Sequence, residues 1–163
     1  MEFLAQFHPP MVHFAIALVI TGVVFDILGF IFKKESLKNA GFWTIMFGIL
    51  AVWGATFTGH EAEELVEDAI KGTVAYEILE QHEEIGEILP WIVTVLGIIR
   101  TFLHLRPNNK IYIIYLLAGI LVAGAVGYQG RIGGKLVFEH GVGTKVMEKS
   151  KYNKEYYHSD EDD

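Results

Sequence analysis

The sequence predicts an all-α membrane protein: an antiparallel bundle of four transmembrane helices with a short helical outer connection and an irregular C-terminal tail. Hydrophobic residues make up 52% of the 163 residues. They gather in four blocks, at residues 10–32, 41–58, 88–105 and 111–128. Each block has about the 20 residues that a helix needs to cross a ~30 Å hydrocarbon layer. We expect one transmembrane domain at residues 1–145 and a disordered polar tail at residues 146–163.

A soluble bundle of four helices is disfavoured by the pattern inside these blocks. Such a bundle would carry polar residues on one face of each helix, whereas residues 15–25 and 111–126 are almost uniformly apolar on every face. No Lys or Arg precedes the first block, so we expect that block to stay as a membrane anchor and not to be a cleaved signal peptide.

Proline and glycine predict where the first two spans begin and end. Pro9 and Pro10 favour a helix start, because proline in the first turn gives up only a donor that has no partner inside the helix. His8 then lies at the cap and His13 in the first turn. Gly59 is predicted to end the second span.

The outer connection, residues 59–87, is predicted to hold two short helices separated by Gly72, at residues 61–71 and 74–89. The second runs into the third span, where Pro90 is predicted to kink it. His82 shares an apolar stripe with Val74, Ile78, Ile85 and Leu89, while the carboxylates lie off that stripe. His82 is therefore predicted to face the interior of the bundle.

The distribution of Lys and Arg predicts the orientation in the membrane. These residues crowd the first connection and flank the third, whereas the second connection carries Lys71 alone. By the positive-inside rule the first and third connections are cytoplasmic. We expect a multi-pass protein of a prokaryotic inner membrane with both termini outside, although Lys and Arg beyond residue 130 oppose this orientation.

Five of the seven histidines fall at the outer face by this topology: His8, His13, His60, His82 and His140. Imidazole is the usual protein ligand for haem iron and for Zn, Cu and Ni. Because the chain has no cysteine, thiolate-ligated and covalently attached haem are excluded.

The preferred function is an integral membrane b-type cytochrome with one or two non-covalent haem b groups near the outer face. The favoured iron ligands are His13 with His82, and then His60 with His140. His8 is an alternative ligand or a hydrogen-bond partner of a haem propionate. Facing helices of a bundle commonly hold haem in this way.

Electron exchange is expected at the outer surface, because no histidine lies in the middle of a span. The expected partner is a membrane quinol or an external soluble redox protein, and an electron carrier is favoured over a stand-alone enzyme, so no catalytic residue is assigned. We also expect contact with membrane lipid, no nucleic-acid partner, and a homodimer formed through small residues on the spans.

Two alternatives remain open at this point. The histidines could bind Zn, Cu or Ni together with Glu61, Glu64 or Glu139, in a metal-binding or metal-transport protein. They could also cap helices and bond lipid headgroups in a structural subunit without a cofactor.

One acidic residue interrupts an apolar span and needs a partner or a proton. Asp26 lies about two turns from the inner end of the first span, and Arg100 lies at a similar depth in the third. A buried Asp26–Arg100 ion pair is the simplest expectation. Proton handling by Asp26 is the alternative.

Two motifs carry a resemblance to a known family: HPPMVHF at residues 8–14 and GGKLVFEHGVG at residues 133–143. Together they resemble a prokaryotic family of four-span membrane proteins catalogued as domain of unknown function 2231, over roughly residues 5–145. Some members of that family are linked to redox domains, which implies a haem role. The resemblance also implies that the five outer histidines are the characteristic polar residues of the family.

Overall fold

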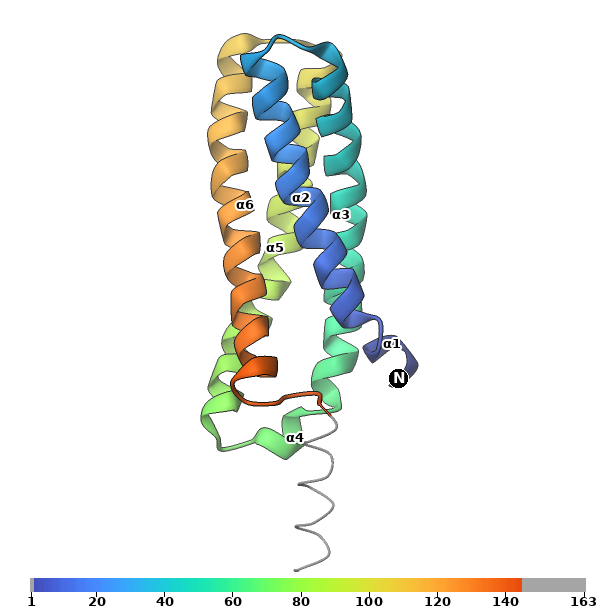
Figure 1. The fold of residues 1–163 in the computed structure, drawn as a ribbon, viewed down its shortest axis with the longest axis vertical. Coiled ribbons are helices and arrows are strands. Elements are labelled where there is room, and N and C mark those ends of the chain that lie inside the picture. Colours follow the sequence, from blue (N-terminus) through green and yellow to red (C-terminus); the bar gives the residue numbers. More distant parts are fainter. Residues whose placement is uncertain (1, 145–163) are drawn as a thin grey trace, which may run out of the picture.

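The structure, a computed structural model, describes residues 2–144 and is helical almost throughout that range, with no strand there. Two short helices accompany four long ones (Figure 1). The elements are α1 (Glu2–Ala5), α2 (His8–Ile31), α3 (Glu35–Glu64), α4 (Glu67–Ile70), α5 (Val74–Leu105) and α6 (Asn109–Phe138). The predicted polar tail, residues 146–163, lies outside the described residues.

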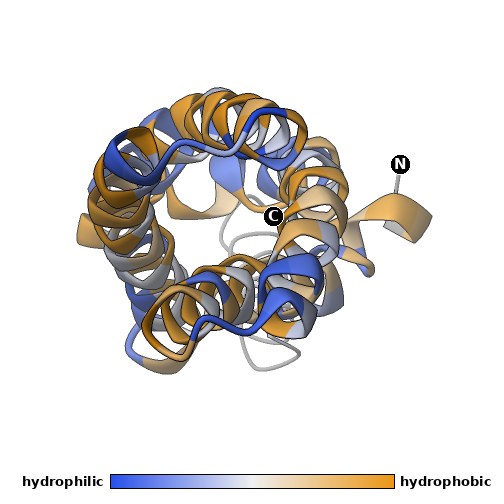
Figure 2. Cartoon of the chain, turned by 90° about the horizontal axis from the view of Figure 1, so that it is seen from above, coloured by the Kyte–Doolittle hydropathy of each residue, from blue (hydrophilic) through white to orange (hydrophobic). Residues whose placement is uncertain are grey.

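The four long helices form an antiparallel bundle in which α2 and α5 lie diagonally. Helix α3 packs against both α2 and α5, and α6 does the same from the other side. Seen along the bundle axis, the four helices form a ring (Figure 2). Residues that share a depth on α2, α3, α5 and α6 therefore meet in the interior.

The outer surface of the bundle is apolar. All four long helices are long and apolar enough to cross a membrane. Leu50, Trp91 and Leu121 expose 67%, 64% and 75% of their surface, and apolar residues colour the outward faces in Figure 2. A contiguous apolar surface of this size is unfavourable in water and favourable in lipid. The protein is thus an all-α membrane protein, as the sequence predicts.

Two helices extend further than predicted. Helix α3 continues through Gly59 to Glu64, and α6 continues past residue 128 to Phe138. The GGKLVF part of the C-terminal motif is therefore helical, and the turn comes later, where Gly141 and Gly143 have φ of 67° and 74°. Only glycine adopts such backbone angles without strain.

The start of α5 agrees with the predicted break at Gly72, whose φ is 79°. Helix α5 begins at Val74 and continues through Pro90 to Leu105. The predicted apolar stripe is wrong at its first residue, because Val74 is 63% exposed. Leu89 is buried as predicted, and Ile78 and Ile85 are half-buried. In the first two turns of α5 the buried side chains are those of Ala75 and Leu79, each one residue after a predicted position.

Between the two ends of the bundle the interior is apolar. Val19, Ile45 and Val93 are fully buried there, with 0% of their surface exposed. Polar side chains gather at two levels, one toward each end. We call the end with the α3–α5 connection the histidine end and the opposite end the Asp26 end.

Candidate functional site

Four helices contribute polar side chains to the interior of the histidine end, and we call this group the histidine layer. It consists of His8 at the start of α2, Thr58 on α3, and His82 on α5 with Gln129 on α6. His8 and Thr58 face each other because α2 begins beside the outer part of α3. Sequence reasoning placed His82 in this interior but did not identify Thr58 or Gln129.

The two imidazoles of the layer lie close together. The ring centres of His8 and His82 are 6.4 Å apart, and the ring planes are at 83°. Nδ1 of His8 lies 3.0 Å from the carbonyl oxygen of Ala55 and 3.4 Å from Oγ1 of Thr58. A hydrogen bond from Nδ1 to the carbonyl oxygen fixes the ring and leaves its Nε2 as an acceptor.

Gln129 connects α6 to the same layer. Its Nε2 donates to the backbone carbonyl oxygen of His82 at 2.6 Å. The amide of Gln129 thus ties α6 to the histidine segment of α5.

Buried polar atoms without a hydrogen-bond partner are concentrated at this end. Within residues 2–144 there are three: Nδ1 of His82, Oε1 of Gln129 and Oε2 of Glu61. Glu61 lies one helical turn beyond Thr58 on the same face of α3. Buried polar groups in proteins are nearly always paired, so three orphans at one level indicate a site for water, an ion or a cofactor.

Two glycines bring the helix backbones against the imidazoles. A Cβ atom at Gly59 would lie 3.1 Å from Cε1 of His8, and one at Gly133 would lie 3.0 Å from Cε1 of His82. Both distances are tighter than ordinary van der Waals contact. The sequence predicted that Gly59 ends a helix. In the structure Gly59 lies within α3 and lets the ring of His8, from α2, pack closely against the α3 backbone.

The other histidines lie elsewhere. His13 is exposed, and its Nδ1 lies 2.6 Å from the carbonyl oxygen of Pro9 on its own helix. His140 is exposed after the end of α6, and His104 stacks on Phe42 at the Asp26 end. The structure thus places His8, and not His13, beside His82.

His60 belongs to a separate cluster on the surface of the histidine end. Ligand atoms of His60, Glu63 and Glu83 all lie within 4.8 Å of one another. Nε2 of His60 is also 3.9 Å from Oε1 of Glu87. These residues face each other from α3 and α5. No contact joins His60 to His140 among the described residues, so the structure does not bring that predicted pair together.

The Asp26 end holds a buried ion pair. Nε of Arg100 donates to Oδ2 of Asp26 at 2.8 Å, and Nη2 donates to Oδ1 at 3.0 Å. Asp26 is 0% exposed and Arg100 is 2% exposed. Nη2 of Arg100 also donates to the carbonyl oxygen of Lys38 at 2.6 Å. Such bidentate pairing is the strong form of an Arg–carboxylate contact.

Two tyrosines complete the surroundings of the carboxylate. The hydroxyl of Tyr112 donates to Oδ1 of Asp26 at 3.0 Å, and that of Tyr115 donates to Oδ2 at 2.7 Å. Gly41 on α3 makes room for the group, since a Cβ there would lie 2.5 Å from Oδ1. Sequence reasoning missed both tyrosines, although their spacing of three in an apolar helix puts them on one face.

The fold and its two polar levels define a four-span integral membrane protein whose chemistry-bearing side chains lie inside the bundle near its ends. A profile of the predicted membrane proteins designated DUF2231, a domain of unknown function, matches residues 5–146, so the chain belongs to that family. No curated protein and no solved structure is significantly similar to the chain.

Proposed function

We propose that this protein is an integral membrane b-type cytochrome in which His8 and His82 ligate one haem b at the histidine end. The observation that carries the proposal is the 6.4 Å separation of the two imidazole centres. Two imidazoles bonded to one metal ion through bonds of about 2 Å place their ring centres roughly 6 Å apart. The two rings also come from diagonal helices of a four-helix bundle, a common arrangement for haem ligands.

The surroundings of the two rings support this assignment. The contact of Nδ1 of His8 with the carbonyl of Ala55 is the kind that orients a metal-binding imidazole. The unpaired Nδ1 of His82 and Oε1 of Gln129 offer polar contacts that no described residue uses. These contacts support the choice of His8 and His82 as the proposed ligands.

A haem bound here supplies reversible one-electron transfer. The residues around it bind and orient the two imidazoles, and the apolar interior below them, with Val19 and Val93 fully buried, excludes water. We propose a membrane quinol or a soluble redox protein as electron partner. The carboxylates of Glu63, Glu83 and Glu87 at this end favour a basic soluble partner.

The proposal revises the ligand pairing. Of the favoured ligands, His82 is kept, and His8 takes the role first given to His13, whose side chain is exposed. The reason is that α2 begins at His8, so the first residue of the helix reaches across to Thr58, while His13 points outward on its second turn. One haem is proposed, where the sequence left one or two open.

The orientation and the oligomeric state belong to the same proposal. With the lysines of the α2–α3 loop in the cytoplasm, the histidine end faces outward across a prokaryotic inner membrane. A homodimer is proposed through the small residues of α6, where Gly127 is exposed and has no other atom within 4 Å of a Cβ built on it. Exposed small residues allow close approach of two helices in lipid.

A second candidate function is metal binding at the surface of the histidine end. The ligand atoms of His60, Glu63 and Glu83 are close enough to share one ion. An imidazole with two carboxylates is a ligand set that Zn accepts. Cu or Ni would compete for the imidazole. This site and the haem site share no ligand, so they are separable by mutation.

The test is the absorption spectrum of the purified wild-type protein, produced with haem available and recorded oxidised and then dithionite-reduced, with metal analysis of the same sample. We expect a reduced α-band, a Soret shift and close to one haem per chain. A colourless protein would overturn the haem proposal. A colourless protein that carries stoichiometric Zn or Cu, lost in the Glu63→Gln variant, would support the second candidate.

A further inference from the structure

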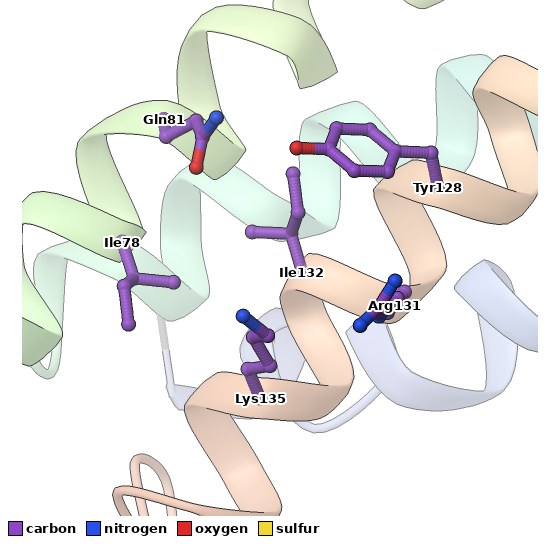
Figure 3. A pocket seen from close by; sticks show the side chains of 6 residues that line it. All are labelled: Ile78, Gln81, Tyr128, Arg131, Ile132 and Lys135. Atoms are coloured by element: carbon purple, nitrogen blue, oxygen red, sulfur yellow. The ribbon is translucent and has the colours of Figure 1, made fainter.

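A groove between α5 and α6 lies outside the histidine layer and is used by neither proposed function. Its volume is about 180 Å³. It is lined by Ile78 and Gln81 of α5 and by Tyr128, Arg131, Ile132 and Lys135 of α6. Lys135 and Tyr128 extend toward Gln81 across this space (Figure 3).

The groove holds two cations that have no anionic partner among the residues described. Neither Arg131 nor Lys135 lies within 4.0 Å of a carboxylate in residues 2–144. Neither side chain makes a hydrogen bond in that range. The chain has 20 acidic and 13 basic residues, so carboxylates that could pair with a cation outnumber the cations. Two unpaired cations one helical turn apart favour an external anion.

Gln81 keeps the opposite wall of the groove uncharged. The outer part of α5 is strongly acidic, with carboxylates at residues 77, 80, 83, 84 and 87. The two residues of α5 that line the groove are the apolar Ile78 and the amide Gln81, and neither is a carboxylate. A carboxylate at residue 81 would supply an internal partner for the two cations, whereas an amide leaves them for a ligand and can itself donate to an oxyanion.

The depth of the groove matches the headgroup layer of a membrane. Tyr128 ends the apolar block 111–128, and with a rise of 1.5 Å per residue Arg131 lies about 4.5 Å and Lys135 about 10.5 Å further out. The headgroup region adds roughly 5–8 Å to each side of the hydrocarbon core. The long side chain of Lys135 can reach back into this layer. Ile132 is buried and Ile78 half-buried, which gives the groove an apolar wall.

We propose that this groove binds the headgroup of an anionic phospholipid from the leaflet at the histidine end. The guanidinium of Arg131 and the ammonium of Lys135 hold the phosphodiester, and Gln81 and the hydroxyl of Tyr128 donate to its oxygens. Tyr128 and Ile132 contact the apolar part of the lipid below the phosphate. The site combines positive charge at the level of the phosphates with an apolar wall toward the acyl chains, as lipid recognition requires.

The experiment is native mass spectrometry of the full-length protein, delipidated in detergent and titrated with phosphatidylglycerol, with phosphatidylcholine, or with glycerol phosphate. We expect one tightly bound phosphatidylglycerol, weaker binding of phosphatidylcholine, and no comparable binding of glycerol phosphate. Arg131→Gln and Lys135→Gln should each weaken phosphatidylglycerol binding about fivefold. Gln81→Glu should weaken it to a similar extent by providing an internal anion.

Lys71→Gln is the control, because the substitution changes the net charge by the same amount at the same end of the bundle. Lys71 is exposed, lies 3.6 Å from a carboxylate oxygen of Glu67, and does not line the groove. It should leave the affinity unchanged. The proposal is overturned if the Arg131→Gln/Lys135→Gln protein binds phosphatidylglycerol as wild type does, or if Lys71→Gln weakens binding equally. It is also overturned if glycerol phosphate binds as tightly as the lipid. Unchanged melting temperatures of these surface variants establish that they are folded.

Discussion

The carboxylate of Asp26, 0% exposed, receives four hydrogen bonds, two of them from Arg100. Breaking a buried ion pair by removing one partner leaves the other charge uncompensated. Asp26→Asn and Arg100→Gln should therefore each destabilise the protein by about 3–5 kcal/mol. Thermal unfolding in detergent, with the exposed Arg106→Gln as control, measures the effect.

The double variant distinguishes a structural pair from a proton carrier. Asp26→Asn with Arg100→Gln removes both charges, so its destabilisation should be smaller than the sum of the two single changes. Additive single effects would contradict a direct energetic coupling. A folded double variant that transfers electrons as wild type does would favour the structural role over proton handling.

The hydroxyl of Tyr115 is predicted to contribute more to the free energy of unfolding than the hydroxyl of an exposed tyrosine. Tyr115→Phe removes the hydroxyl that donates to Oδ2 of Asp26, so a buried carboxylate loses one of its four hydrogen bonds and keeps that from Nε of Arg100. The expected loss is about 1–3 kcal/mol of unfolding free energy. Tyr128→Phe, at a residue that is 50% exposed, should change it by less than about 0.5 kcal/mol. Equal losses would show that the hydrogen bond to Asp26 adds nothing.

Gly41 tests the close approach of α3 to the ion pair. In Gly41→Ala the new Cβ would lie 2.5 Å from Oδ1 of Asp26, so the helices must separate and the melting temperature should fall. Gly124→Ala adds the same atom where nothing lies within 4 Å, and alanine in a helix should then stabilise by about 0.5–1 kcal/mol. A tolerated Gly41→Ala would contradict the packing described here.

Adjacent glycines test the packing around His82. Gly133→Ala puts a Cβ 3.0 Å from Cε1 of His82, whereas Gly134→Ala meets nothing within 4 Å. If His82 ligates haem, Gly133→Ala should shift the Soret band or lower the haem content, and Gly134→Ala should not. Identical spectra for the two variants would contradict ligation of the haem by His82.

The bundle was predictable from sequence because lipid imposes a strong and local rule. A span needs about 20 apolar residues, and that pattern is visible without any knowledge of partners. Gly72 is an equally local signal, since its φ of 79° favours glycine. The ends of α3 and α6 were harder to predict, because Gly59 and Gly133 permit a helix to continue wherever packing stabilises it.

Which side chains contact one another at each of the two polar levels was less predictable from the sequence. Asp26 and Arg100 could be paired from their depth alone, since a charged side chain within a transmembrane span needs an opposite charge and few are present at that depth. His8 and His13 differ by five residues, and only the rotation of α2 decides which one faces His82. The rotation depends on packing against α3, which periodicity does not reveal when a helix is apolar on every face.

The most direct test of the haem assignment is the reduced-minus-oxidised spectrum of three variants beside wild type, each produced with haem available. His8→Ala and His82→Ala should each abolish or strongly perturb the same b-type signal, because both remove an axial ligand. His13→Ala should retain the wild-type spectrum. Loss of the signal in His13→Ala with retention in His8→Ala would contradict the proposed ligation.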